Sequence, residues 1–174
     1  MSIEILKTLI PEYAKDIRLN LSTLAMDESL NPEQLWGTFL ASALATRQKT
    51  VIAHMTAEVS PRLSPEALNA VKSAASIMAM NNIYYKFTGM MAEEYKTLPA
   101  KLRMNVIGNP GVDKAHFELW ALAVSVINGC QFCVKSHENI LREHGLKIEH
   151  IQTAVRIASV LHAVATILDT EEAG

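Results

Sequence analysis

The sequence lacks several features that mark common classes of protein. The formal net charge is only −2, and acidic and basic residues are interspersed, which argues against nucleic acid or an anionic membrane as a partner. The first residues lack a basic segment followed by an apolar run and a small-residue cleavage site, so we expect no secretory signal and a cytoplasmic location. There is also no glycine-rich fingerprint of a dinucleotide site. What remains is one domain of ordinary size.

Helical periodicity runs through nearly the whole chain. No segment shows strict alternation with β-branched enrichment, so the predicted fold class is all-α. Pro11, Pro32 and Pro65 are each expected at the start of a helix, and Gly145 at the end of one. Residues 97–112, rich in proline and glycine, are expected to form the main loop. Helices are predicted over residues 11–24, 32–46, 48–59, 64–81, 113–127, 131–144 and 148–168.

The two sides of that loop resemble each other at a constant offset of 84 residues. Leu35-Trp36 matches Leu119-Trp120, and the block from Ala70 to Ala79 matches the block from Ala154 to Ala163. One offset without gaps predicts two copies of a helical unit, about 31–96 and 113–170, around a pseudo-two-fold axis within a single domain. Four positions differ in chemistry: the first copy has Gln34, Thr46, Lys49 and Ala53, and the second has Glu118, Cys130, Cys133 and His137.

The only two cysteines, Cys130 and Cys133, form a CxxC motif in the second copy. Asn128-Gly129 is a helix-stop signal, so Cys130 is expected to open the next helix, where unpaired N–H groups and the helix dipole favour a thiolate. His137 lies one turn beyond Cys133 on the same helix face. A tight turn would also fold the preceding helix back and bring Glu118 toward the histidine. This arrangement predicts a redox site.

Two other interpretations of the cysteines stay open. They could be a pair of small buried apolar side chains. They could also bind zinc together with His137 and either His116 or Glu118, although structural zinc usually draws on two separated pairs of ligands.

Several other side chains are predicted to be structural. Trp120 and Phe132 are expected in the core or in a cleft wall. The histidines at 116, 144 and 150 are expected at the surface, and those at 54 and 162 packed or partly exposed on helices. Methionines and aromatics between the two copies suggest either core filling or self-association. They are Met78, Met80, Met90, Met91, Tyr84, Tyr85 and Phe87.

The motif resembles one known family. Glu118, eleven residues, Cys130-x-x-Cys133, three residues and His137, with the flanking Phe-Glu-Leu-Trp and Ser-x-Ile-Asn-Gly-Cys, look like the alkyl hydroperoxidase D (AhpD) family of the carboxymuconolactone-decarboxylase-like superfamily. The opening Met-Ser-Ile-Glu-x-Leu-Lys, Pro-Glu-Tyr-Ala-Lys-Asp, Gln-Leu-Trp-Gly-Thr and Met-Asn-Asn are also similar to that family. The resemblance therefore covers essentially the whole chain.

The resemblance implies an all-helical homotrimer with a peroxidase site. Cys133 would pass through a sulfenic acid, Cys130 would close the redox disulfide and donate a proton, and Glu118 with His137 would relay protons. It implies no bound cofactor and no metal. It implies instead an adaptor that carries electrons from the dihydrolipoyl groups of a 2-oxo acid dehydrogenase acyltransferase to the peroxiredoxin alkyl hydroperoxide reductase C. The best-known members have histidine where this chain has Phe132, which cannot carry a proton.

A thioredoxin analogy would make Cys130 the nucleophile, whereas the register of His137 favours Cys133, and we follow the histidine. A peroxidase that reduces hydroperoxides through this dithiol is the primary prediction. The alternatives are a CxxC electron carrier with little direct peroxidase activity, a zinc-binding structural module and, less favoured, a decarboxylase, whose chemistry does not need the two thiols.

Overall fold

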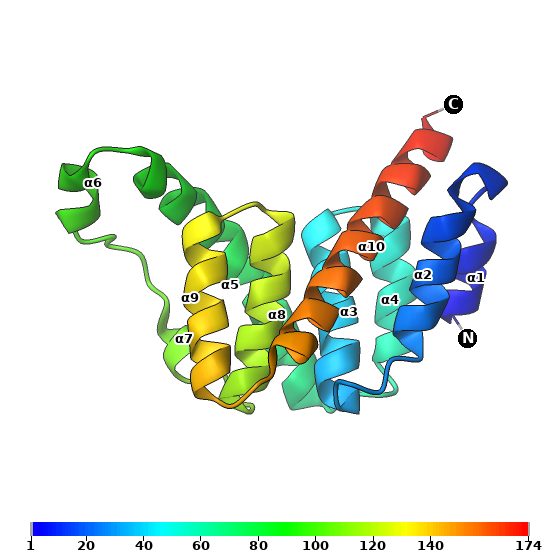
Figure 1. Ribbon diagram of the computed structural model, residues 1–174, viewed down its shortest axis with the longest axis horizontal. Helices are drawn as coiled ribbons and strands as arrows, with labels where there is room; N and C mark the ends of the chain where they lie inside the picture. The colour runs from blue at the N-terminus through cyan, green and yellow to red at the C-terminus, as the bar shows by residue number, and fades with distance from the viewer. Residues whose placement is uncertain (1, 174) are drawn as a thin grey trace.

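The computed structural model describes residues 2–173, and this part of the chain is all-α, as predicted (Figure 1). It contains ten α-helices, one 3-10 helix and no strand. The helices are α1 (Ser2–Thr8), α2 (Lys15–Ala25), α3 (Pro32–Thr46), α4 (Lys49–Val59), α5 (Pro65–Met90), α6 (Glu93–Thr97), α7 (Asn105–Gly108), α8 (Lys114–Ile127), α9 (Gln131–Glu143) and α10 (Ile148–Glu172), with the 3-10 helix at Glu12–Ala14.

The core lies where α3, α5, α8 and α10 pack against one another. Trp120 on α8 is fully buried, as predicted, together with Phe39 on α3 and Phe117 on α8. The Trp120 indole lies directly against the backbone of Gly37, in the space that a β-carbon would fill. Only glycine permits this close approach of α3 and α8, and α8 carries Glu118 of the site described below.

Two of the three predicted proline starts are confirmed. Pro32 follows Asn31, whose side chain accepts the Gln34 N–H in a capping box, and Pro65 follows Ser64, which caps its helix through the Ala67 N–H. The third prediction is wrong. Pro11 precedes a 3-10 helix, so α2 begins only at Lys15, and the short α1 before it was not predicted.

Helix α5 is longer than predicted, because it continues past residue 81 to Met90. Asparagine is a poor helix former, yet Asn82 is fully buried and donates to Ser125 Oγ at 2.9 Å. Its Oδ1 accepts from Asn128 Nδ2 at 2.9 Å. These hydrogen bonds to α8 and to the turn after it outweigh the low helix propensity of asparagine. They place the end of α5 beside the cysteine motif.

The last turns of α5 and the helix α6 form an arm that projects from the body of the molecule (Figure 1). Beyond it the chain returns through the predicted loop at 97–112, where the short α7 was not predicted. Large apolar side chains of the arm and loop are exposed. They are Ile83, Phe87, Met90, Tyr95 and Leu98.

The bounds of α3, α4 and α5, shifted by 84, fall within three residues of the bounds of α8, α9 and α10. This agrees with the proposed repeat in helix order and length, and the pseudo-two-fold axis stays a prediction. Helix α10 is long and apolar enough to cross a membrane, but 61% of its most apolar window is buried inside this fold. Such burial is typical of a core helix.

Candidate functional site

The predicted turn at Asn128-Gly129 ends α8 and presents Cys130 to the next helix. Gly129 adopts the left-handed conformation with φ of +67°, which costs glycine little. Its N–H donates to the Val126 carbonyl at 3.1 Å, and the Cys130 N–H donates to the Ser125 carbonyl at 3.1 Å. This Schellman motif reverses the chain and makes Cys130 the N-cap of α9, as expected.

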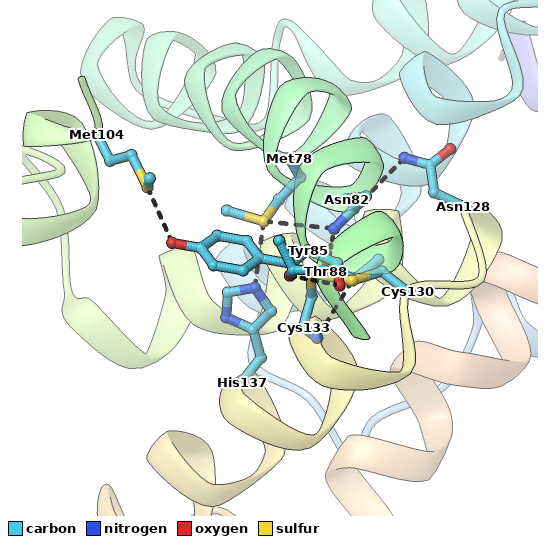
Figure 2. Close-up of a disulfide and its surroundings, with 10 residues drawn as sticks. Met78, Asn82, Tyr85, Thr88, Met104, Asn128, Cys130, Cys133 and His137 are labelled. Carbon is cyan, nitrogen blue, oxygen red and sulfur yellow. Dashed lines mark hydrogen bonds between the residues drawn. A yellow bond between two sulfur atoms is a disulfide. The ribbon is translucent and has the colours of Figure 1, made fainter. Parts of the chain in front are cut away.

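Cys130 and Cys133 are joined in a disulfide, and their Cα atoms lie 5.3 Å apart (Figure 2). The Cys133 N–H points at Cys130 Sγ, 3.3 Å away. Both sulfur-bearing residues are buried, with Cys130 wholly inaccessible and Cys133 4% exposed. The first turn of α9 therefore directs the Cys133 N–H at the Cys130 sulfur, which acts as the cap of the helix.

The turn also brings Glu118 and His137 together, as predicted. Glu118 is completely buried on α8, and its Oε2 lies 2.5 Å from Nδ1 of His137 on α9. The imidazole is 6% exposed. On its other side, Nε2 lies 3.2 Å from the sulfur of Met78 on α5. Three helices thus hold the ring in one orientation.

A lysine ammonium also faces the carboxylate. Lys114 Nζ lies 2.7 Å from Glu118 Oε1, one turn earlier on α8, and also donates to the Ile107 carbonyl at 2.5 Å. Burial raises the pKa of the Glu118 carboxyl, but the hydrogen bond from His137 and the Lys114 ammonium outweigh it and hold this pKa below the ordinary value. Glu118 is therefore an anion at neutral pH.

A cavity of about 170 Å³ opens beside these groups. Cys133, His137 and Glu118 line it, whereas Cys130 does not. Its remaining lining is mainly apolar and comes from α5, from the loop with α7, and from α9. These residues are Met78, Asn81, Tyr85, Met104, Ile107, Phe132, Ser136 and Ile140.

Phe132 forms part of the wall of this cavity, as predicted. Its ring stacks on Tyr85 with centroids 5.1 Å apart, and 57% of the residue is exposed. The Tyr85 hydroxyl points toward the Met104 sulfur at 3.9 Å. Both rings also line the outer grooves next to the cavity. The position adjacent to Cys133 therefore supplies an apolar wall and no proton carrier.

His116 lies apart from the cysteines. Its ring contacts Glu33 through Nδ1 at 2.8 Å and Asn31 through Nε2 at 3.2 Å, both at the start of α3. Within residues 2–173, no group of three or more histidine, cysteine or acidic residues is arranged to hold a metal ion. The zinc interpretation therefore finds no set of four ligands in this fold.

Three residues of the site were missed in the sequence. Lys114 had a signal, because it lies four residues before Glu118 on a predicted helix. The sequence held no signal for Met78 and Tyr85, because they reach the site from α5, in the stretch interpreted as core filling or self-association. Met78 lies 59 residues before His137, and Tyr85 lies 47 residues before Phe132.

Comparisons with known proteins identify the family of this chain. The sequence profile of the Carboxymuconolactone decarboxylase family matches residues 93–173. A protein of Gluconacetobacter diazotrophicus named alkyl hydroperoxide reductase AhpD is 59% identical over 169 residues, which is 97% of this chain and 93% of that protein. Proteins of the same name from Maricaulis maris and Brucella anthropi are 55% and 52% identical, and each alignment covers at least 98% of both chains.

Proposed function

This chain belongs to the AhpD family of alkyl hydroperoxide reductases, and we propose that it reduces organic hydroperoxides through the Cys130–Cys133 dithiol. One observation carries the proposal. Cys133 shares a cavity with the paired Glu118 and His137, whereas Cys130 does not line that cavity and is fully buried. The cysteine that a peroxide can reach is therefore the one beside the proton relay.

In the reduced enzyme, His137 takes the proton of the Cys133 thiol, and the Glu118 anion stabilises the imidazolium that results. The thiolate attacks the distal oxygen of ROOH, and the O–O bond breaks. ROH leaves with the proton from the relay, and Cys133 becomes a sulfenic acid. Cys130 then attacks that sulfur, water leaves, and the disulfide forms. One peroxide thus consumes two thiols.

The cavity indicates which peroxides fit. Thioether, aliphatic and aromatic side chains provide most of its wall, so a hydroperoxide with a small apolar alkyl or aryl group gains burial there. The single polar end of such a molecule would face Cys133 and His137. We therefore expect organic hydroperoxides to be preferred over hydrogen peroxide.

The enzyme is restored when an external dithiol reduces the disulfide. We propose the dihydrolipoyl arm of a 2-oxo acid dehydrogenase acyltransferase as the donor, because its second thiol releases the arm by ring closure. A helical fold offers no parallel-sheet crevice for a dinucleotide, which favours a reductant that arrives as a thiol. In the adaptor role, the reduced pair would pass its electrons to a peroxiredoxin of the alkyl hydroperoxide reductase C type.

A specific observation favours a second function, electron transfer with slow direct peroxidase activity. Phe132 occupies the position next to Cys133, and its exposed ring can pack against a partner but cannot donate a proton to the leaving alkoxide. Measuring peroxide consumption with dihydrolipoamide, with and without the peroxiredoxin, separates the two. Fast consumption by this protein alone supports the peroxidase, and consumption only with the peroxiredoxin supports the carrier.

We also propose that the chain assembles into a homotrimer. The arm formed by the end of α5 and by α6 exposes Phe87, Met90 and Tyr95, which a monomer would leave in water. Of the methionines and aromatics suggested for self-association, Met78 is instead buried in the site, whereas Met90 is 67% exposed. Burial of the arm against a second copy would remove this apolar surface from solvent.

A further inference from the structure

We infer that Met78 is a positioning residue of the redox site, whose thioether sulfur holds the Nε2 proton of a His137 imidazolium toward the cavity. The expected effect on turnover rests on the proposed peroxidase function. The contact between Met78 and His137 is observed in the structure and does not depend on that function. No sequence motif marks Met78, and its side chain reaches His137 from a different helix.

Both ring nitrogens of His137 face groups that only accept hydrogen bonds. Nδ1 lies 2.5 Å from the Glu118 carboxylate, and Nε2 lies 3.2 Å from the sulfur of Met78. A thioether carries no hydrogen, and an ionised carboxylate carries none either. Both contacts are attractive only when both nitrogens carry hydrogens, which is the imidazolium form. On this inference, Nε2 takes up a proton from solvent once the disulfide has formed and holds it until the disulfide is reduced.

The sulfur is held in place from its other side. Met78 is 1% exposed, and the Asn82 side-chain nitrogen lies 3.9 Å from the sulfur (Figure 2). Asn82 is itself fixed by its bond to Ser125 Oγ at 2.9 Å. Because His137 is also buried, the thioether takes the place at Nε2 that water would otherwise occupy.

A thioether is a suitable acceptor for an N–H whose proton must later move to Cys133. Sulfur in methionine is a weak acceptor, so it orients the N–H without retaining the proton. When an external dithiol has reduced the disulfide, Cys133 is released as a thiolate. The Nε2 proton then passes to Cys133 Sγ and leaves a neutral imidazole. Before the next peroxide attack, the same nitrogen takes that proton back.

Other ionisable groups near the ring are few. Glu118, with Lys114 behind it, faces the ring from α8, and Tyr85 and Cys133 line the same cavity from α5 and α9. The remaining lining from α7 and the segment before it, Met104 and Ile107, does not ionise. A substitution of Met78 should therefore change the titration of His137 without a contribution from other nearby groups.

The test compares Met78→Leu, which removes the acceptor at similar volume, with Met78→Gln, which supplies a stronger oxygen acceptor. Met55→Leu is the matched control, because Met55 is equally buried on α4 away from the site. We expect Met78→Leu to lower turnover about 3- to 10-fold and to move the acidic limb of the pH–rate profile to lower pH. Met78→Gln should move that limb to higher pH.

The His137 ring nitrogens of the ¹⁵N-labelled disulfide form give the same comparison without any substrate. Their midpoint of titration should shift down in Met78→Leu, up in Met78→Gln and not at all in Met55→Leu. Shifts of the same sign in both Met78 variants, or a Met78→Leu protein that matches Met55→Leu, overturn the inference. Failure of the wild type to consume peroxide would count against the proposed function alone.

Discussion

Nδ1 of His137 lies 2.5 Å from Oε2 of Glu118, and this buried pair joins the two helices on either side of the cysteine turn. Glu118 precedes the turn and His137 follows it, so the contact exists only because the Schellman motif at Gly129 folds α9 back along α8. Local backbone geometry therefore assembles a thiol, an imidazole and a carboxylate from one stretch of twenty residues.

The first prediction concerns this relay. Glu118→Gln and His137→Gln should each slow peroxide turnover roughly 10²- to 10⁴-fold, because general acid–base catalysis is worth about that much. Stopped-flow peroxide consumption with dihydrolipoamide measures the effect. His116→Gln is the control, because it removes a second histidine–glutamate pair, between α8 and α3, that lies outside the site. Wild-type turnover in either relay variant would remove that residue from the relay.

The second prediction assigns the cysteines. Cys133→Ser should abolish peroxide turnover, because the cavity would then contain no thiol. Cys130→Ser should leave a sulfenic acid or mixed disulfide at Cys133 that a sulfenic-acid reagent traps. Mass spectrometry of the labelled peptide identifies the modified residue. If the trapped sulfenic acid were found on Cys130 in the Cys133→Ser protein, the two assignments would be reversed.

The third prediction is a pH dependence of stability. The folded state holds the pKa of Glu118 below that of an unfolded glutamate, so its ion pair stabilises the protein at neutral pH. This contribution is lost as the pH falls through the lowered pKa. Glu118→Gln should therefore lower the free energy of unfolding by roughly 1–3 kcal/mol at pH 7. This difference between the variant and the wild type should become smaller in acid. Urea unfolding of the oxidised proteins, at one protein concentration and several pH values, measures this. A difference in unfolding free energy that grows toward low pH would contradict the ion pair as the source of the stability.

The fourth prediction is self-association through the arm. Light scattering at micromolar concentration should give a mass well above that of one chain, and Met90→Lys should lower it by placing a charge on the apolar arm. Met26→Lys is the control, since Met26 is 80% exposed at the end of α2, outside the arm. A wild-type monomer would reject the trimer, and equal effects of both substitutions would reject the arm as its interface.

The fifth prediction concerns the electron donor. Dihydrolipoamide should reduce the Cys130–Cys133 disulfide far faster than glutathione at equal thiol concentration, because its second thiol closes a ring. Reduction by dithiothreitol separates a general preference for dithiols from recognition of the lipoyl group. If dithiothreitol reduces the disulfide as fast as dihydrolipoamide does, the preference is for any dithiol. If it is slower, the protein recognises the lipoyl group. Comparable rates for glutathione and dihydrolipoamide would leave the donor assignment unsupported.

Local signals in the sequence were enough to predict the helices that carry the site and the turn between them. Gly129 supplies the left-handed residue, Cys130 caps α9, and the spacing to His137 follows from the helical period. The contacts that α5 makes with the site could not be predicted in this way. Helix α5 continues because Asn82 finds hydrogen-bond partners on α8 and the turn, and Met78 reaches His137 only as a result of that packing.

The most direct measurement is a thiol count on the reduced protein after one equivalent of an organic hydroperoxide. Alkylation followed by intact mass should show that both thiols are lost, that the protein is roughly 2 Da lighter, and that one equivalent of alcohol has formed. These results together require a dithiol that becomes a disulfide at the expense of the O–O bond. Retention of both alkylatable thiols after peroxide treatment would contradict a redox role for Cys130 and Cys133.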